Sequence, residues 1–282
     1  AENFRQHDVQ ELCRVLFTAL AKYGVNIEPK LLEGTLKSTL KCLRCGNRST
    51  RDEAFCDVAL DVEQSETLQH ALGEFTKWEV LDDWRCDVCE DKVPALKGMR
   101  LSRLPPVLML QLKRFTFDFA TLRRKKLNHR VAFPAEGLDM QPYTQEPPPP
   151  PEAAAAAAEL AKTAPPSSSS SSAEQAAADA TAEEVTAADG SVYDCIGVML
   201  HSGSAQGGHY TALLRPGRKP PPTEGTAGAP APEGAADTAD AADASEPSPG
   251  WYEFNDATVS PISGAELARA AGEGAPSATG ND

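Results

Sequence analysis

The sequence predicts an α+β domain that is interrupted by two insertions without a fold of their own. Three observations support this class: an amphipathic helical pattern near the N-terminus, a series of short strand-like runs, and two long stretches dominated by Pro, Ala and acidic residues. Strand-like runs resume soon after each stretch. We therefore interpret both stretches as insertions within one domain and not as linkers between two.

The first predicted element is a helix over residues 3–20, where Phe4, Val9, Leu12, Leu16 and Leu20 recur about one helical turn apart. A second amphipathic helix is predicted over residues 67–75. The run at 107–115 begins with four apolar residues and follows two prolines, which favours a buried strand. Further strands are predicted at residues 35–43, 55–62, 115–119, 195–201, 209–215 and 251–254.

The two insertions span residues 146–190 and 216–250. The first contains five consecutive prolines, an alanine block and a serine run, with eight acidic residues and one lysine; the second has six acidic and two basic residues. Neither holds enough large apolar side chains to offset about 1–2 kcal/mol of backbone entropy per residue. We predict that both are disordered and that residues 266–282 form a low-complexity tail.

Composition excludes several classes of protein. The formal charge of −14 argues against a nucleic-acid-binding protein, which needs a basic face. No apolar run approaches the roughly 20 residues of a membrane span, and the beginning of the chain does not resemble a signal peptide. The odd number of cysteines, seven, favours a reducing cytoplasmic or nuclear setting over a disulfide framework. The first residue is not Met, so we expect an N-terminally truncated fragment.

Four cysteines have the spacing of a metal site. Cys42 with Cys45 and Cys86 with Cys89 form two CxxC turns that are separated by 40 residues. Four thiolates around Zn²⁺ give a closed structural site without an open position for water. The spacing therefore predicts a structural zinc site, with a hairpin filling the gap. The alternative is two unrelated CxxC turns, one of them redox-active.

A histidine preceded by two glycines is the second candidate site. Gly207-Gly208-His209 presents an imidazole at the start of a predicted strand, and Asn255 and Asp256 follow the strand at 251–254. If these strands pair as a hairpin, Asn255 returns close to His209 and orients its ring, as a general base requires. The alternative is an ordinary loop histidine. His201 closes the preceding strand, and we expect it to have a structural role.

Five segments in this order resemble the ubiquitin-specific proteases, a family of papain-like cysteine deubiquitinases. They are Gln6-His-Asp-Val-Gln-Glu-Leu12, the four cysteines, Leu110-Gln-Leu-Lys-Arg-Phe115, Gly207-Gly-His-Tyr-Thr-Ala-Leu213 and Trp251-Tyr-Glu-Phe-Asn-Asp256. The resemblance implies one catalytic domain with a papain-like fold over residues 1–145 and 191–265. Its parts would be a helical thumb at 3–33, zinc-ribbon fingers at about 35–100, and a palm sheet at about 101–145 and 191–265.

The resemblance also implies roles for individual residues. His209 would be the general base, Asn255 its orienting partner and Asp256 a second candidate for that support. Ubiquitin and ubiquitinated proteins would be the partners, and the side chains expected beside the channel for the ubiquitin tail are Gln6, Asp8, Glu11 and Tyr210. We expect Phe115 to be packed in the interior, because aromatic side chains of strands are more often core than ligand-contacting.

One family segment has no counterpart. The nucleophile of the family lies in a Gly-Asn-Thr-Cys-Tyr segment, and neither Cys13, Cys56 nor Cys195 lies in such a context. We expect the nucleophile upstream of this chain, which would then be inactive alone. Three functions remain open: a fragment of an active deubiquitinase, a ubiquitin-binding module without catalysis, and a zinc-ribbon scaffold whose acidic insertions recruit partners.

Overall fold

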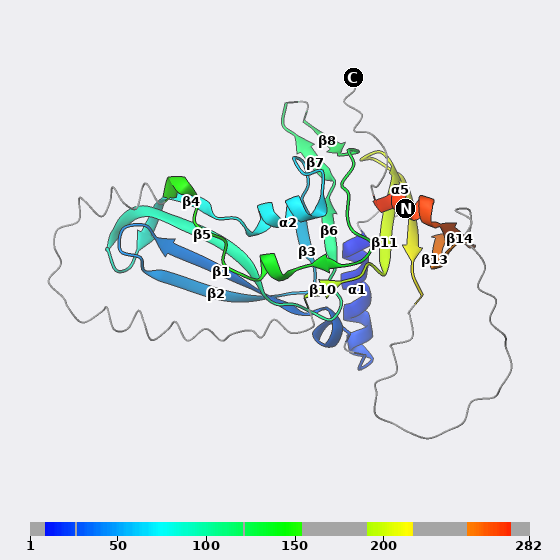
Figure 1. Ribbon diagram of the computed structural model, residues 1–282, viewed down its shortest axis with the longest axis horizontal. Coiled ribbons are helices and arrows are strands. Elements are labelled where there is room, and N and C mark those ends of the chain that lie inside the picture. The colour runs from blue at the N-terminus through cyan, green and yellow to red at the C-terminus, as the bar shows by residue number, and fades with distance from the viewer. Residues whose placement is uncertain (1–8, 26, 121, 154–190, 217–246, 272–282) are drawn as a thin grey trace, which may run out of the picture. The chain divides into compact units, whose positions relative to one another are not determined.

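The structure is a computed structural model that describes residues 9–25, 27–120, 122–153, 191–216 and 247–271 (Figure 1). These residues form two compact units, one within 1–131 and 137–193 and the other within 132–136 and 194–282. Both units contain helix and sheet. The start of the predicted first helix, most of both insertions and the tail from residue 272 lie outside the described residues.

The first unit begins with helix α1 (Val9–Lys22) and the short π-helix η1 (Glu28–Leu32). The predicted helix is confirmed from residue 9 onward. Leu12 and Leu16 of its apolar stripe are exposed. Polar contacts hold α1 instead: Arg14 Nη2 lies 3.0 Å from Asp57 Oδ2, and Gln10 also donates a hydrogen bond to Asp57.

An antiparallel sheet in the order β2-β1-β5-β4 dominates this unit (Figure 1). Its strands are β1 (Gly34–Cys42), β2 (Arg48–Phe55), β4 (Glu79–Cys86) and β5 (Asp91–Arg103). Because β1 pairs with β2 through a turn at 43–47 and β4 pairs with β5 through a turn at 87–90, both CxxC turns close hairpins. The register Cys42↔Ala95 brings the two hairpins together at one end of the sheet.

Sequence patterning found β1 but missed β2, β4 and β5. Every residue of β2 except Phe55 is exposed, and β4 is also largely exposed, so neither strand alternates between apolar and polar residues. The predicted strand at 55–62 is wrong in its limits. Phe55 ends β2, and β3 (Val58–Asp61) begins a separate pairing, parallel to β6 (Leu110–Lys113).

The core of the first unit lies around helix α2 (Leu68–Thr76), which was predicted almost to the residue. Thr67 caps it by accepting a hydrogen bond from the His70 amide, and Leu72 is fully buried together with Leu60 and Val62. Strand β6 is shorter than the predicted run at 107–115 and only partly buried, which corrects the expectation of a buried strand.

The remaining strands of this unit form two small pairs. β7 (Phe115–Asp118) and β8 (Arg123–Lys126) make a hairpin, while β9 (Leu138–Asp139) pairs with β10 (Val192–Tyr193) beside the 3₁₀-helix η2 (Gln141–Tyr143). Phe115 is 44% exposed, so the expected interior packing of this side chain is wrong.

The second unit is an antiparallel sheet in the order β11-β12-β13-β14. Its strands are β11 (Gly197–Gly203), β12 (Gly208–Leu214), β13 (Pro247–Asn255) and β14 (Thr258–Ser263), followed by helix α5 (Gly264–Ala271). The three strands predicted here are confirmed within a few residues at each end. One cluster of buried side chains joins sheet and helix: Leu213, Trp251, Ile262 and Leu267.

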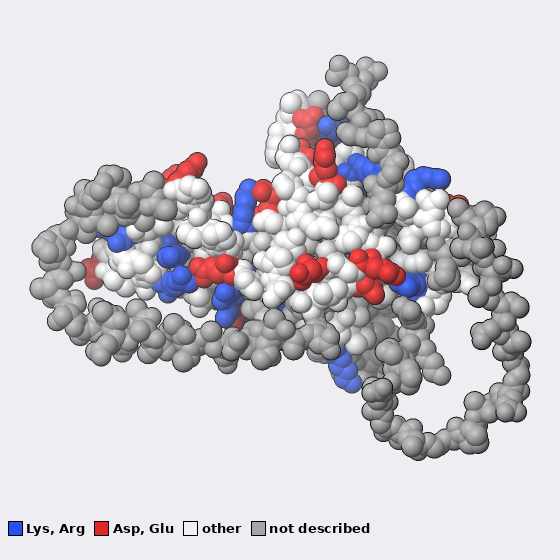
Figure 2. Space-filling view, viewed as in Figure 1, with Lys and Arg blue, Asp and Glu red and all other residues white. Residues whose placement is uncertain are grey.

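Charged side chains are mixed over the visible face of the described residues. Lys and Arg lie interspersed with Asp and Glu and do not gather in one patch (Figure 2). Several of them form ion pairs, among them Arg48 with Glu146 at 2.7 Å and Arg215 with Glu136 at 3.0 Å. Among the described helices, none is long and apolar enough to cross a membrane.

Candidate active site and metal centre

His209 and Asn255 meet across the β12–β13 pair of the second unit. Ala212 is opposite Phe254 and Leu213 opposite Glu253, so continuation of this register by one residue places Asn255 opposite Thr211. Thr211 and His209 are two residues apart and therefore share one face of the sheet. The Nε2 atom of His209 lies 2.6 Å from Oδ1 of Asn255.

This contact determines which ring nitrogen carries the proton. An amide oxygen only accepts hydrogen bonds, so Nε2 of the neutral ring must donate, and Nδ1 retains the lone pair. This assignment of the proton to Nε2 follows from the orientation of the Asn255 side chain, whose oxygen Oδ1 faces the ring. The His209 side chain is 45% exposed, which leaves the ring accessible. The pair can therefore accept a proton at Nδ1 while Asn255 holds the ring in position.

Asp256 contributes less directly than Asn255. It lies in the two-residue turn between β13 and β14 with φ of 47°, in the left-handed region that Asn, Asp and Gly tolerate best. Its Oδ2 atom is 3.8 Å from His209 Nε2, beyond hydrogen-bonding distance, and its side chain is 82% exposed. The sequence left both residues open as the histidine's partner, and the structure brings Asn255 into contact.

His201 lies on the face of the β11–β12 hairpin that is opposite to His209. It is opposite Tyr210, and the two ring centroids are 4.7 Å apart. A Cβ atom on Gly208 would lie 2.4 Å from His201 Nε2 and 2.0 Å from the Ser202 carbonyl oxygen. Only glycine therefore fits at position 208, which explains the second glycine before His209. Both neighbours of His209 in the chain thus contact the His201 ring.

The other sequence-predicted residues of the ubiquitin channel are only partly described. Glu11 lies exposed on α1, and Gln6 and Asp8 fall outside the described residues. Tyr210 is partly buried beside His201, on the face of the β11–β12 hairpin opposite to His209. Sequence reasoning missed Asp57, which binds Arg14 and Gln10 of α1, because no local pattern marks a carboxylate whose partners are more than 40 residues away.

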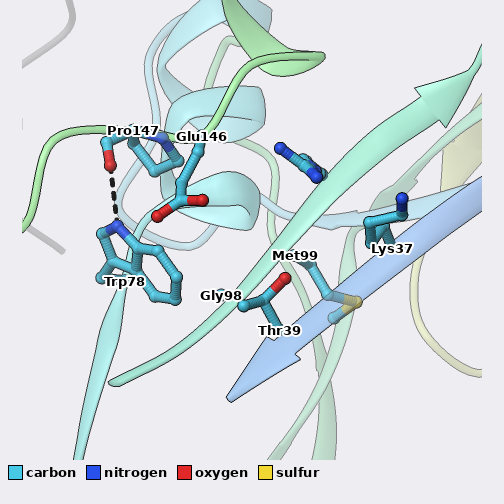
Figure 3. Close-up of a pocket in the computed structure, with 8 residues that line it drawn as sticks. Lys37, Thr39, Trp78, Gly98, Met99, Glu146 and Pro147 are labelled. Atoms are coloured by element: carbon cyan, nitrogen blue, oxygen red, sulfur yellow. Dashed lines mark hydrogen bonds between the residues drawn. The ribbon is translucent and has the colours of Figure 1, made fainter. Parts of the chain in front are cut away.

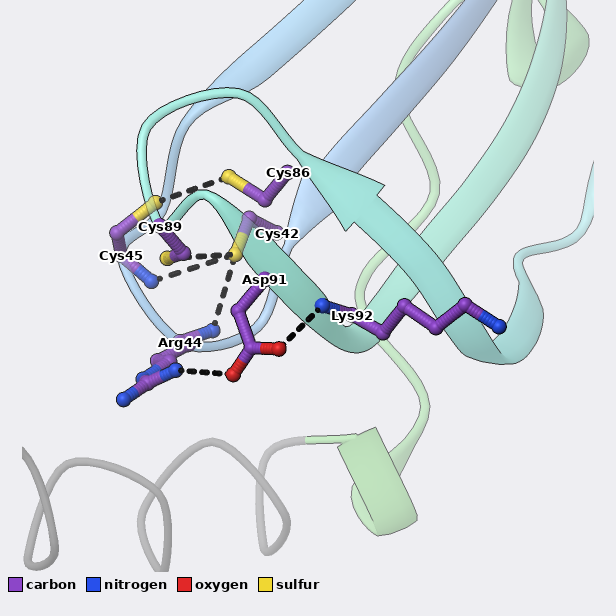
Figure 4. A network of polar contacts seen from close by, with 7 residues as sticks. All are labelled: Cys42, Arg44, Cys45, Cys86, Cys89, Asp91 and Lys92. Carbon is purple, nitrogen blue, oxygen red and sulfur yellow. Dashed lines mark hydrogen bonds and ion pairs between the residues drawn. The ribbon is translucent and has the colours of Figure 1, made fainter.

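The four predicted metal-ligating cysteines come together at the end of the first unit's sheet (Figure 4). All four sulfur atoms lie within 4.8 Å of one another; the Cys42–Cys89 distance is 3.9 Å and the Cys45–Cys86 distance is 3.6 Å. Tetrahedral Zn²⁺ with Zn–S bonds of about 2.3 Å requires S–S separations of about 3.8 Å. The cluster therefore fits a four-thiolate zinc ion.

Backbone and side-chain contacts support the two turns. The amides of Arg44 and Cys45 each donate a hydrogen bond to Cys42 Sγ at 3.4 Å. Gly46 adopts φ of 76°, which the turn after the second ligand requires. The guanidinium of Arg44 pairs with Asp91 at 3.3 Å, so an ion pair links the first turn to the strand that follows the second (Figure 4).

The proton affinities of the thiols differ strongly. Burial, assisted by the neighbouring sulfurs, raises the pKa of Cys89 to about 12. Burial also acts to raise the pKa of Cys86, but hydrogen bonds from the backbone amides of Cys89 and Val88 outweigh it and lower this pKa to about 7. Without a cation the cluster must hold protons on some of its sulfurs. A divalent ion would displace them, which is the usual coupling between metal binding and thiol ionisation.

Comparison with known proteins finds two similar chains of the same name. A chain of Xenopus laevis named Ubiquitin carboxyl-terminal hydrolase 47 is 34% identical over 245 residues, and the human protein of the same name is 31% identical over 246 residues. Each match covers 76% of this chain, which spans only 18% of the length of either relative. The runs at 111–119 and 201–209 and the pair Leu127-Asn128 are especially similar to ubiquitin-specific protease 47.

A solved structure shows the same fold. The SAGA Ubp8/Sgf11/Sus1/Sgf73 DUB module bound to ubiquitin aldehyde matches 94% of this chain and 47% of that chain, with a TM-score of 0.62 and 23% identity. This match confirms the predicted fold class. A sequence model described as Ubiquitin carboxyl-terminal hydrolase matches residues 1–275. The chain therefore belongs to the ubiquitin carboxyl-terminal hydrolase family, which includes the ubiquitin-specific proteases.

Proposed function

We propose that this chain is part of a thiol-dependent deubiquitinase, in which His209 is the general base and Asn255 orients it. The observation that carries the proposal is the 2.6 Å contact between His209 Nε2 and Asn255 Oδ1. It leaves Nδ1 free to take the proton of a thiol, which is the first requirement of a cysteine hydrolase. Family membership supplies the substrate class, conjugates of ubiquitin.

We further propose that the nucleophile comes from a segment preceding Gln6 in the whole protein. None of the seven cysteines in this chain has the surroundings of an activated nucleophile, and all seven are described. Four belong to the sulfur cluster. Burial raises the pKa of Cys195, the opposite of activation, and Cys13 lies within α1, away from the helix N-terminus that would stabilise a thiolate. Cys56 lies in the bend between β2 and β3.

The proposed reaction follows from the ring's protonation state. His209 Nδ1 takes the thiol proton, and the thiolate forms a bond to the carbonyl carbon of ubiquitin's terminal glycine. The C–N bond to the substrate's lysine breaks, and the imidazolium returns the proton to the leaving amine. Water then attacks the thioester with His209 again acting as base, which releases ubiquitin and regenerates the thiol. Asn255 keeps the ring oriented through each transfer.

The cysteine cluster has a structural role in this proposal. When bound, Zn²⁺ would crosslink the β1–β2 and β4–β5 hairpins through Cys42, Cys45, Cys86 and Cys89 and stabilise the distal end of the sheet. We infer that this sheet supports a surface for the globular part of ubiquitin. We also propose a reducing cytoplasmic or nuclear location, which the odd number of cysteines and their metal-ligand spacing favour.

A ubiquitin substrate with a fluorogenic C-terminal group tests the proposal. The chain alone should show no turnover, while the protein extended upstream of Ala1 should hydrolyse the substrate and lose this activity on His209→Ala. Turnover by the chain alone would disprove the proposal that the nucleophile lies outside this chain. An inactive extended protein would disprove the catalytic proposal: retained binding of ubiquitin would then favour the binding module, and folded protein without binding would favour the scaffold.

A further inference from the structure

The five-proline run that opens the first insertion is held against the sheet of the first unit. Residues 146–153 are described, although we predicted the insertion to begin at 146. Each residue from Glu146 to Pro150 precedes a proline, and a following proline sterically excludes the helical region for the residue before it. Proline also fixes its own φ near −65°. Residues 147–150 therefore have little choice other than a polyproline II conformation.

Three contacts anchor the run at its two ends. The indole Nε1 of Trp78 donates a hydrogen bond to the Pro147 carbonyl oxygen at 2.7 Å (Figure 3). Arg48 pairs with Glu146 at 2.7 Å. At the other end, Ala153 is buried in one apolar cluster with Trp78, Leu43 and Leu96. The indole itself lies against Gly98, where a Cβ would come within 2.7 Å of the ring.

Exposure along the run shows which prolines face solvent. Pro147 and Pro150 are partly buried, whereas Pro148, Pro149 and Pro151 are exposed. A polyproline II helix has about three residues per turn, so positions three apart lie on the same edge. Pro151 is also the first residue of a helical segment described over residues 151–153, and the extended residues before it set the position of its ring. The anchored edge carries Pro147 and Pro150, and the outward edge presents Pro148 and Pro151 with Pro149 beside them. The exposed pair thus has the Pro-x-x-Pro spacing.

We propose that this outward edge is a docking site for a protein domain that recognises polyproline II helices in an aromatic-lined groove. Such domains gain affinity because the ligand's conformation is preformed and little entropy is lost on binding. Here the anchors add a second restraint, since they hold both ends of the run to a folded sheet. Glu152 follows the run and is exposed, so the groove should have a basic side chain near the end that receives Pro151.

This site is separate from the proposed hydrolysis, and neither His209 nor the nucleophile takes part in it. A partner bound here would bring the enzyme to other proteins. The test therefore needs no turnover, and its outcome does not depend on whether the proposed function is correct.

The experiment is a binding titration of the zinc-loaded 282-residue chain against a panel of purified SH3, WW and EVH1 domains and profilin. We expect saturable binding to at least one member. The double substitution Pro148→Ala/Pro151→Ala should weaken this binding by about 10-fold or more, which corresponds to about 1.4 kcal/mol. Glu152→Lys should weaken it as well, because it reverses the charge that faces the basic rim.

Two controls separate the docking edge from the anchor. Gln145→Ala changes an exposed side chain outside the run and should leave binding unchanged. Trp78→Phe keeps an apolar ring but removes the hydrogen bond to Pro147, and it should weaken binding by a smaller factor than the double substitution. Absence of binding to every panel member would overturn the proposal. So would undiminished binding of a folded Pro148→Ala/Pro151→Ala chain.

Discussion

The imidazole of His209 and the carboxamide of Asn255 are 46 residues apart in the sequence, and their Nε2 and Oδ1 atoms lie 2.6 Å apart. The antiparallel pairing of β12 with β13 produces this contact, because its register puts both side chains on one face of the sheet. The same face carries the buried residues Leu213 and Trp251 farther along the strands, so core packing maintains the register on which the pair depends.

The first prediction concerns this pair. In the protein extended upstream of Ala1, His209→Ala should lower kcat by about 10²–10⁴-fold, the usual contribution of a general base. Asn255→Ala should lower kcat with little change in KM, because it frees the ring to adopt other orientations and tautomers without touching the substrate. Steady-state kinetics with a fluorogenic ubiquitin substrate measure both effects.

Asp256→Asn is the matched control for the Asn255 substitution. It alters the neighbouring side chain, whose Oδ2 is 3.8 Å from the ring and largely exposed, so its effect should be much smaller than that of Asn255→Ala. A larger loss with Asp256→Asn than with Asn255→Ala would contradict the assignment of the orienting role to Asn255.

The second prediction concerns the glycine pair that precedes His209. Gly208→Ala should reduce the free energy of unfolding by about 1–3 kcal/mol, because the new methyl group would overlap the Ser202 carbonyl and the His201 ring. Gly207→Ala should be tolerated, since a Cβ at Gly207 would meet nothing within 4 Å. Thermal unfolding of the two variants followed by circular dichroism gives the comparison. Equal stability of both variants would contradict the close approach of His201 to Gly208.

The third prediction concerns metal. The purified chain should contain one equivalent of zinc by elemental analysis, and Cys42→Ser or Cys86→Ser should reduce this content sharply. Cys13→Ser is the control, because Cys13 lies on α1 outside the cluster and its loss should leave the zinc content unchanged. Removal of zinc with a chelator should lower the melting temperature, since the four thiols would no longer crosslink the two hairpins. A metal-free chain of unchanged stability would refute the structural site.

The fourth prediction concerns pH and helix α5. Hydrogen bonds from the Ser263 amide and hydroxyl to the Glu266 carboxylate lower the pKa of Glu266 below its ordinary value of 4.5, and the Ser263 hydroxyl in turn accepts from the Glu266 amide, which completes a capping box. Because the folded-state pKa is the lower one, this stabilisation is present above the unfolded-state pKa and is lost as the pH falls through the folded-state pKa.

Glu266→Gln should therefore lower the melting temperature at pH 7 and have a smaller effect at pH 3. Ser263→Ala should produce a similar loss at pH 7, because it removes one side of the same capping box. Differential scanning calorimetry across this range measures both variants. A Glu266→Gln effect that is the same at both pH values would show that the carboxylate's ionisation does not stabilise the α5 cap.

The elements that were predicted well are those whose signal is local. Helix α2 combines an apolar stripe with a capping threonine, and β11 alternates between exposed and partly buried residues over its first four positions. Strands β2 and β4 were missed because the structure leaves nearly all of their side chains in solvent, so neither needs apolar residues. Backbone pairing with β1 and β5 stabilises them, and no single-strand pattern reports on pairing.

The amino-acid sequence was enough to identify the groups that could do chemistry: two CxxC turns with metal-ligand spacing, and a histidine preceded by glycines and followed later by Asn255 and Asp256. These are short-range features, since turn geometry and side-chain type are properties of a few neighbouring residues. Which of these groups meet depends on long-range packing. The register of β12 and β13 places Asn255, and not Asp256, in hydrogen-bonding contact with His209. Pairing of the two hairpins brings the four sulfurs together, and Trp78 binds the proline run through the Pro147 carbonyl. Each of these contacts joins residues dozens of positions apart, and their meeting depends on how the whole chain packs.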